Sequence, residues 1–102
     1  MSKGKFQFSA KLWRYPSTVA SWHFISLPKE VAQEIKEKYG KGARAWGSLA
    51  VEVLVGKSKW DTSIFRDNKS GTYILPVKAT VRKKEGIVSG DECKVVLTVK
   101  TG

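Results

Sequence analysis

Apolar and polar residues alternate with a period of two through most of this chain, and that pattern constrains its fold most strongly. In residues 5–14, for example, Phe6, Phe8 and Leu12 fall in one phase and polar residues fall in the other. Such alternation buries one face of an extended strand and exposes the opposite face. The sequence predicts strands over residues 5–14, 20–27, 49–55, 58–65, 72–75 and 93–100.

Two short helices are predicted, each after a Leu-Pro pair. Apolar residues recur every four positions after Pro28, which predicts an amphipathic helix over residues 29–39. A second helix is predicted over residues 77–85, with Val77 and Val81 on its inner face. Glycine follows both segments and ends them. The predicted order of elements is therefore ββα–βββα–β.

The strand–Leu-Pro–helix unit occurs twice, at Leu27-Pro28 and at Leu75-Pro76, about 48 residues apart. Two equivalent halves that close one barrel would remove the open edges that six strands otherwise expose. We therefore predict a mainly β fold, a six-stranded and mostly antiparallel closed barrel with two short helices after Leu-Pro turns. The sequence has no linker or low-complexity segment, so residues 1–102 are expected to form a single β-barrel domain.

Length and cysteine content also indicate where such a domain resides. The single cysteine, Cys93, excludes an intramolecular disulfide and suits a reducing compartment. No apolar run approaches the roughly 18 residues that a membrane span requires. The first residues lead directly into a strand pattern, without the apolar region of a signal peptide. We expect a cytoplasmic protein that does not associate with membranes.

Residues that carry chemistry are few. His23 is the only histidine and Cys93 the only cysteine, so together they cannot supply the ligands of a structural zinc site. Glu52 and Asp61 face each other across a predicted hairpin, where each is expected to pair with a lysine. No nucleophile and base occur in a catalytic pattern. The sequence thus predicts a non-enzymatic protein with no metal and no cofactor.

The charge is strongly unbalanced, with 19 Lys and Arg against 9 Asp and Glu and a net charge of +10. Such an excess favours binding to nucleic-acid phosphates, and tryptophans between cations can stack on bases. The same residues equally fit an alternative in which lysines keep a small barrel soluble and tryptophans plug its ends. The candidate nucleic-acid residues are Arg14, Arg44, Trp46, Lys59, Trp60, Arg66, Lys78, Arg82 and Lys83.

A second hypothesis places a small-molecule site at a barrel mouth, near the Trp60–Ser63 hairpin and the Tyr73–Lys78 turn. The hydroxyl groups there equally suit cross-strand hydrogen bonds. A third hypothesis is an accessory role in a larger assembly. The candidate small-molecule residues are Trp60, Thr62, Ser63, Tyr73 and Lys78.

Two motifs of this chain are specific, Trp-x-Thr-Ser-x-Phe at residues 60–65 and Tyr-x-Leu-Pro-Val-Lys at residues 73–78. They resemble one known family, the small bacterial and archaeal proteins called domain of unknown function 1905. Residues 8–13, 22–28 and 47–52 add to the likeness, which covers nearly the whole chain. The resemblance implies a compact double-split β-barrel with short helices and no established activity. A proline often follows the hairpin phenylalanine in that family, whereas here the next residue is Arg66.

The C-terminal half has a second likeness. Residues 74–91 and the strand after them are similar to the swapped-hairpin unit of transition-state regulators and antitoxin proteins. In those proteins two chains each contribute one unit to a DNA-binding barrel. Because both units occur here in one chain, the likeness implies a barrel that closes as a monomer and adds support to nucleic-acid binding by analogy.

Overall fold

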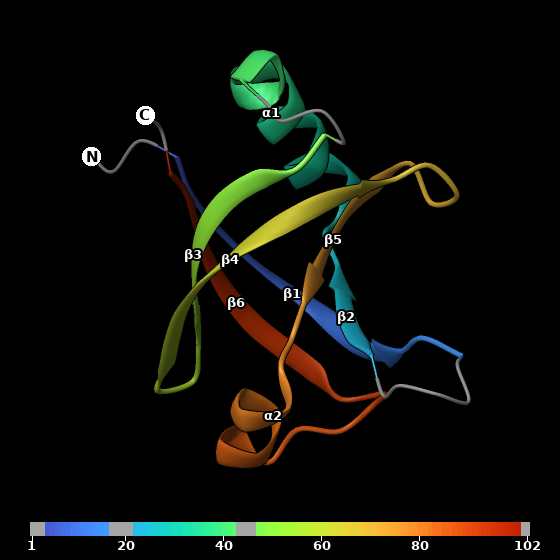
Figure 1. Cartoon of the computed structure of the whole chain (residues 1–102), viewed down its shortest axis with the longest axis vertical. Coiled ribbons are helices and arrows are strands. Elements are labelled where there is room, and N and C mark those ends of the chain that lie inside the picture. The colour runs from blue at the N-terminus through green and yellow to red at the C-terminus, as the bar shows by residue number, and fades with distance from the viewer. Residues whose placement is uncertain (1–3, 17–21, 43–46, 101–102) are drawn as a thin grey trace.

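The structure, a computed structural model, describes residues 4–16, 22–42 and 47–100. Six strands, all antiparallel, close a barrel in the order β1-β2-β5-β4-β3-β6 (Figure 1). This arrangement confirms the predicted fold class and element order. The elements are β1 (Lys5–Arg14), β2 (His23–Ser26), α1 (Lys29–Tyr39), η1 (Gly40–Gly42, a 3-10 turn), β3 (Leu49–Val55), β4 (Ser58–Asp67), β5 (Thr72–Pro76), α2 (Ala79–Glu85) and β6 (Glu92–Val99).

The core is formed by the inward phase of each strand. In β3 every second residue from Leu49 to Val55 is buried, as the alternation predicts. Ile25, Ile64 and Leu97 have no exposed surface and fill the barrel interior. Cys93 lies on the inward phase of β6, and its burial raises the pKa of the thiol.

Two strands change partners along their length, which splits the barrel wall in two places. β1 pairs with β6 over Lys5–Lys11 but with β2 only over Leu12–Arg14. β4 pairs with β3 over Ser58–Ile64 but with β5 only over Phe65–Asp67. Outside these short paired segments, β1 diverges from β2 and β4 diverges from β5. Helices α1 and α2 lie at opposite ends of the barrel (Figure 1).

The barrel consists of two equivalent halves. Exchanging β1 with β4, β2 with β5 and β3 with β6 preserves every strand pairing. Under this exchange, the pair Trp13↔Phe24 in β1–β2 corresponds to Phe65↔Ile74 in β4–β5. The predicted repeat is thus present in the structure.

The two halves align differently from the sequence repeat. Pro28 precedes α1 directly, and the residue that precedes α2 is Lys78 rather than Pro76. The reason lies in two matching backbone hydrogen bonds between β2 and β5. Leu27 N–H donates to Tyr73 O at 2.9 Å, and Val77 N–H donates to His23 O at 3.0 Å. The second of these bonds keeps Val77 extended, so α2 begins only at Ala79. The predicted start of this helix at residue 77 is therefore wrong by two residues.

The β4–β5 hairpin is longer than predicted. The predicted strands end at residue 65 and resume at residue 72, but Arg66 and Asp67 also pair with β5 and leave a turn over residues 68–71. Asp67 closes that turn, since its Oδ2 accepts a 2.6 Å hydrogen bond from Ser70 Oγ. This bond lowers the pKa of the Asp67 carboxyl. The predicted strand over 20–27 is observed over His23–Ser26, and residues 20 and 21 lie outside the described residues.

Candidate functional site: an aromatic groove with a basic end

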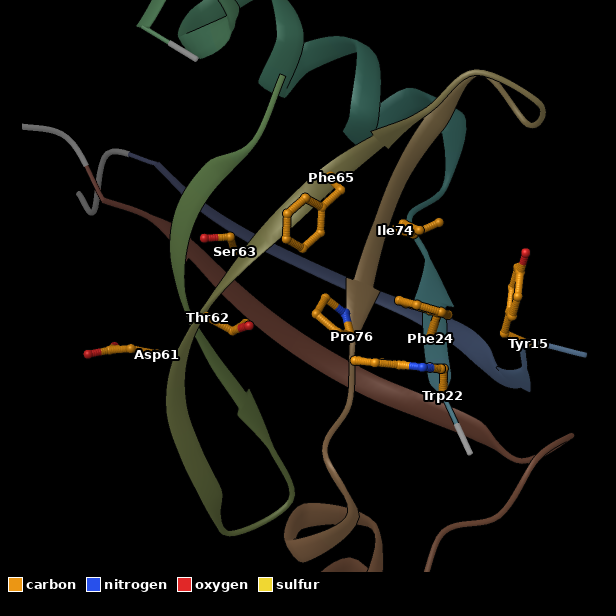
Figure 2. Close-up of a pocket in the computed structure, with 9 residues that line it drawn as sticks. All are labelled: Tyr15, Trp22, Phe24, Asp61, Thr62, Ser63, Phe65, Ile74 and Pro76. Carbon is orange, nitrogen blue, oxygen red and sulfur yellow. The ribbon is translucent and has the colours of Figure 1, made fainter. Parts of the chain in front are cut away.

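A groove of about 780 Å³ lies on the outer face of the barrel over β2, β5 and β4. Figure 2 shows Trp22 and Thr62 pointing toward Pro76 from opposite sides, where β4 diverges from β5. The aromatic groove, as we call it, is lined by Tyr15, Trp22, Phe24, Asp61, Thr62, Ser63, Phe65, Ile74 and Pro76.

Three aromatic side chains of the groove are exposed to solvent. Tyr15 is 49% exposed, Trp22 is 56% exposed and Phe65 is 40% exposed. Among the described residues, only one other large hydrophobic side chain is exposed, that of Val88. A surface that gathers most of its exposed apolar groups in one hollow is typical of a binding site.

Strand geometry explains why these rings face outward. Ile64 is buried in the core, so its neighbour Phe65 must point to the opposite face of β4. Tyr15 and Trp22 flank the β1–β2 connection, and Tyr15 N–H donates to Trp22 O at 2.8 Å. The Tyr15 ring meets Phe24 edge-on, with 6.5 Å between ring centroids. Backbone pairing and ring packing therefore hold the groove walls.

The polar members of the groove lie on β4. Asp61 forms a 2.8 Å ion pair with Lys100, so its charge is already matched. Thr62 points into the gap between β4 and β5, whereas Ser63 points away from it (Figure 2). Glu52 lies opposite Asp61 as predicted and pairs with Lys59 at 3.7 Å. The predicted hairpin geometry and its lysine partners are both confirmed.

A second hollow, of about 410 Å³, continues the groove toward α2 and shares Trp22, Asp61, Thr62 and Pro76 with it. Its further lining includes two cations, Lys78 and Arg82. Arg82 Nε donates to Val77 O at 3.2 Å, which fixes the base of its side chain. The aromatic groove therefore ends at a positively charged patch, called the basic end below.

Residues predicted for nucleic-acid binding are distributed unevenly. Lys78 and Arg82 line the basic end, and Lys59 and Lys83 line neighbouring hollows beside α2. Arg14 is exposed at the end of β1. The Arg66 guanidinium lies 5.8 Å from the centre of the Tyr73 ring, a cation–π contact. Arg44 and Trp46 lie outside the described residues.

Trp60 differs from its predicted placement. Its side chain points into the core from β4 and is only 9% exposed. It therefore offers no free ring face to a base, and the stacking role expected from the sequence is not carried forward. The stacking surface of this molecule belongs instead to rings on the outer phase of the strands.

The residues predicted for a small-molecule site come together only in part. Thr62 and Ser63 line the aromatic groove, and Trp60 and Lys78 join Thr62 around the basic end. Tyr73 is 2% exposed and lines neither hollow. The structure thus places the predicted hairpin beside a real hollow, on the outer wall of the barrel rather than at its mouth.

Sequence reasoning missed Tyr15, Trp22 and Phe65 as site residues. The alternation in β4 could have indicated Phe65: if Ile64 points into the core, the next residue along the strand must point outward. Within the described residues, no three His, Cys, Asp or Glu side chains gather as metal ligands would. In the same part of the chain, no helix has both the length and the apolar character to cross a membrane.

Comparison with known proteins then identifies the family. A family model described as "Domain of unknown function (DUF1905)" matches residues 8–97. The chain belongs to this family. The match includes all six strands of the DUF1905 barrel in whole or in part, together with every residue of the groove. No curated protein matches the chain.

Proposed function

We propose that this DUF1905 protein is a binding module for single-stranded nucleic acid. The observation that carries the proposal is the groove itself, in which exposed aromatic rings lead directly to Lys78 and Arg82. Bases would stack on Trp22 and Phe65, and phosphates would lie at the basic end. Its net charge of +10 supplies long-range attraction to such a polyanion.

Single strands fit this surface better than duplexes do. Stacking on an aromatic side chain contributes about 1–3 kcal/mol per base and needs a base face that is free. In a duplex those faces are covered by neighbouring base pairs, and only base edges are accessible. The groove also lacks an element that protrudes into a duplex groove, because it is a hollow in the outer wall of a sheet.

The test is a fluorescence-anisotropy titration of the full chain with labelled DNA and RNA strands of about 12 nucleotides, and with the matching duplexes. We expect binding to single strands that weakens steeply with salt. Trp22→Ala and Phe65→Ala should each weaken it by about tenfold. Val88→Ala removes an exposed apolar side chain outside the groove and is the matched control. Equal binding by all three variants would exclude the proposal.

The volume of the groove supports a second candidate, a small planar ligand with a negative charge. Small-molecule sites typically measure about 300–1,000 Å³, and the aromatic groove falls in that range. Titration with a mononucleotide separates the two candidates. If it binds as tightly as a strand of about 12 nucleotides, the site accommodates one ring and the small-ligand candidate is correct.

A further inference from the structure

We infer that a separate pocket beside the basic end binds a phosphate monoester group. The lysine pocket, about 400 Å³, lies between the β3–β4 hairpin and α2. It is lined by Lys57, Ser58, Lys59, Trp60, Lys78, Thr80, Val81 and Lys84. A phosphate monoester carries nearly two negative charges at neutral pH and accepts several hydrogen bonds, which suits a hollow surrounded by ammonium groups.

The charges of this pocket are largely unmatched by the protein. Among the described residues, Lys57, Lys78 and Lys84 form no ion pair, and Lys59 reaches Glu52 only at 3.7 Å. Four like charges around one hollow repel one another, and a bound anion would relieve that repulsion. The Thr80 hydroxyl adds a neutral hydrogen-bond donor to the lining.

Glu85, an acidic residue beside the pocket, is already hydrogen-bonded and helps to fix the shape of the pocket. Glu85 Oε2 accepts a 2.6 Å hydrogen bond from Ser58 Oγ, and Glu85 Oε1 accepts a 3.4 Å bond from Lys57 N–H. These bonds tie the C-terminal end of α2 to the β3–β4 hairpin. The two backbone segments that carry these lysines are thereby held on either side of one hollow, which lowers the cost of ordering them when an anion binds.

The lysine pocket adjoins the groove, since Trp60 and Lys78 line both the pocket and the basic end. If bases occupy the aromatic groove, as the proposed function holds, a terminal phosphate of the same strand lies nearest to this pocket. The pocket would then favour strands with a phosphorylated end. A free phosphorylated metabolite is the other source of the same chemical group.

The first test uses inorganic pyrophosphate, with binding to the full chain followed by NMR titration at constant ionic strength. We expect saturable binding that Lys57→Ala with Lys84→Ala weakens by about fivefold to tenfold, since each exposed charge contact contributes modestly. Lys36→Ala with Lys69→Ala removes the same charge outside the pocket and should leave binding nearly unchanged. Equal weakening in both double variants, or no saturation, would overturn the inference.

A pair of single variants provides a second version of this comparison. If the first double variant is unstable, Lys84→Ala and Lys36→Ala form a second matched pair, because each lysine lies in the last turn of a helix and only Lys84 lines the pocket. Loss of pyrophosphate binding in Lys84→Ala alone supports the pocket. Equal loss in both single variants assigns the effect to net charge and overturns it.

The second test separates the two sources of phosphate and compares strands of about 12 nucleotides with a 5′-phosphate, a 3′-phosphate or no terminal phosphate. A preference for one phosphorylated end that disappears in the Lys57/Lys84 variant assigns the pocket to strand ends. Pyrophosphate binding without any strand binding would exclude the proposed function and keep the phosphate site. Strand binding without an end preference would assign the pocket to a free phosphorylated ligand.

Discussion

The barrel contains the same strand pair twice, and the two copies differ in how an aromatic ring covers their outer face. In β1–β2, Trp13 lies opposite Phe24, packs on it at 5.1 Å between ring centroids, and donates its indole N–H to Ser26 Oγ at 2.9 Å. In β4–β5 the corresponding residues are Phe65, Ile74 and Pro76, which leave a hollow. A larger ring with a hydrogen-bond partner thus covers one strand pair, while a smaller ring without one leaves its copy open.

The two helices differ in the same sense. Helix α1 has three lysines and three glutamates, and it buries Ala32 and Ile35. Helix α2 has three cations and one glutamate, and buries only Val81. Helix α1 is therefore electrically balanced, whereas helix α2 is positive and lies beside the hollows. Equivalent backbones thus carry different surfaces in the two halves.

The largest expected effect comes from copying the covered strand pair into the open one. Phe65→Trp with Pro76→Ser reproduces Trp13 and Ser26 at the equivalent positions, so the new indole should cover the hollow. Binding of single strands should weaken by about thirtyfold, or about 2 kcal/mol. Anisotropy titration measures the loss, and circular dichroism verifies the fold. Unchanged binding would show that the ring at position 65 does not form the binding surface.

A smaller effect is expected at the glycines beside the two helices. Gly56, with φ of +59°, lies under the Glu85 carboxylate, and a methyl group there would displace it. A methyl group at Gly4, which has φ of +80°, would come within 2.9 Å of the Tyr39 hydroxyl at the end of α1, a less severe overlap than the one at Gly56. Each glycine-to-alanine change should lower the free energy of unfolding by about 1–2 kcal/mol, measured by guanidinium denaturation.

Gly56→Ala and Gly4→Ala should also differ in their effect on pyrophosphate binding. Only Gly56→Ala should weaken pyrophosphate binding, because displacing Glu85 releases α2 from the β3–β4 hairpin. If Gly4→Ala weakens it to the same extent, the effect spreads through global stability and the two ends are not independent.

Trp13→Phe places in the β1–β2 pair the residue type that Phe65 provides at the equivalent position of β4–β5. It removes the indole hydrogen bond to Ser26 and should cost about 1 kcal/mol of unfolding free energy. Ser26→Ala removes the same bond but keeps the indole, and separates the hydrogen bond from the ring packing on Phe24. No loss of stability in either variant would show that this bond does not hold the cover in place.

The smallest effect concerns the turn that joins β4 to β5. The Ser70 hydrogen bond lowers the pKa of Asp67 below its ordinary value of 3.8, so the folded state favours the carboxylate. The resulting stabilisation is present above the pKa of the unfolded chain and is lost as pH falls through the folded pKa. The stability gap between the native chain and Asp67→Asn should therefore shrink with acid, as followed by urea denaturation. A gap independent of pH contradicts this assignment.

Much of the fold could be predicted because alternation and the Leu-Pro pairs are local signals. Strands β1, β3 and β6 have uninterrupted phase, and their inward residues are the ones that fill the core. The start of α2 could not be predicted, because Val77 is held extended by a carbonyl on β2, far away in sequence. A local pattern contains no information about such a partner.

The candidate site was harder to predict, for a related reason. Lys78 and Arg82 were identified by charge, but Tyr15 and Trp22 come from a connection where alternation stops. The groove exists because β4 pairs with β5 only from Phe65 onward and is apart from it before that residue, and the alternation of residues does not show where a strand changes partner. The stacking hypothesis placed Trp60 at the surface from its chemistry, although its phase in β4 directs it inward, as the alternative of tryptophans inside the barrel ends allows.

Both halves of the barrel belong to one polypeptide, and this has a consequence for how a ligand can be held. An assembly of two identical subunits on the same plan would be obliged to carry two grooves or none, since each change would appear twice. A single chain is free of this restriction, because each half can change separately. A tryptophan can cover one strand pair while a phenylalanine leaves the equivalent strand pair accessible. Such a molecule can present a single, directional binding face while its opposite flank serves only to keep it folded.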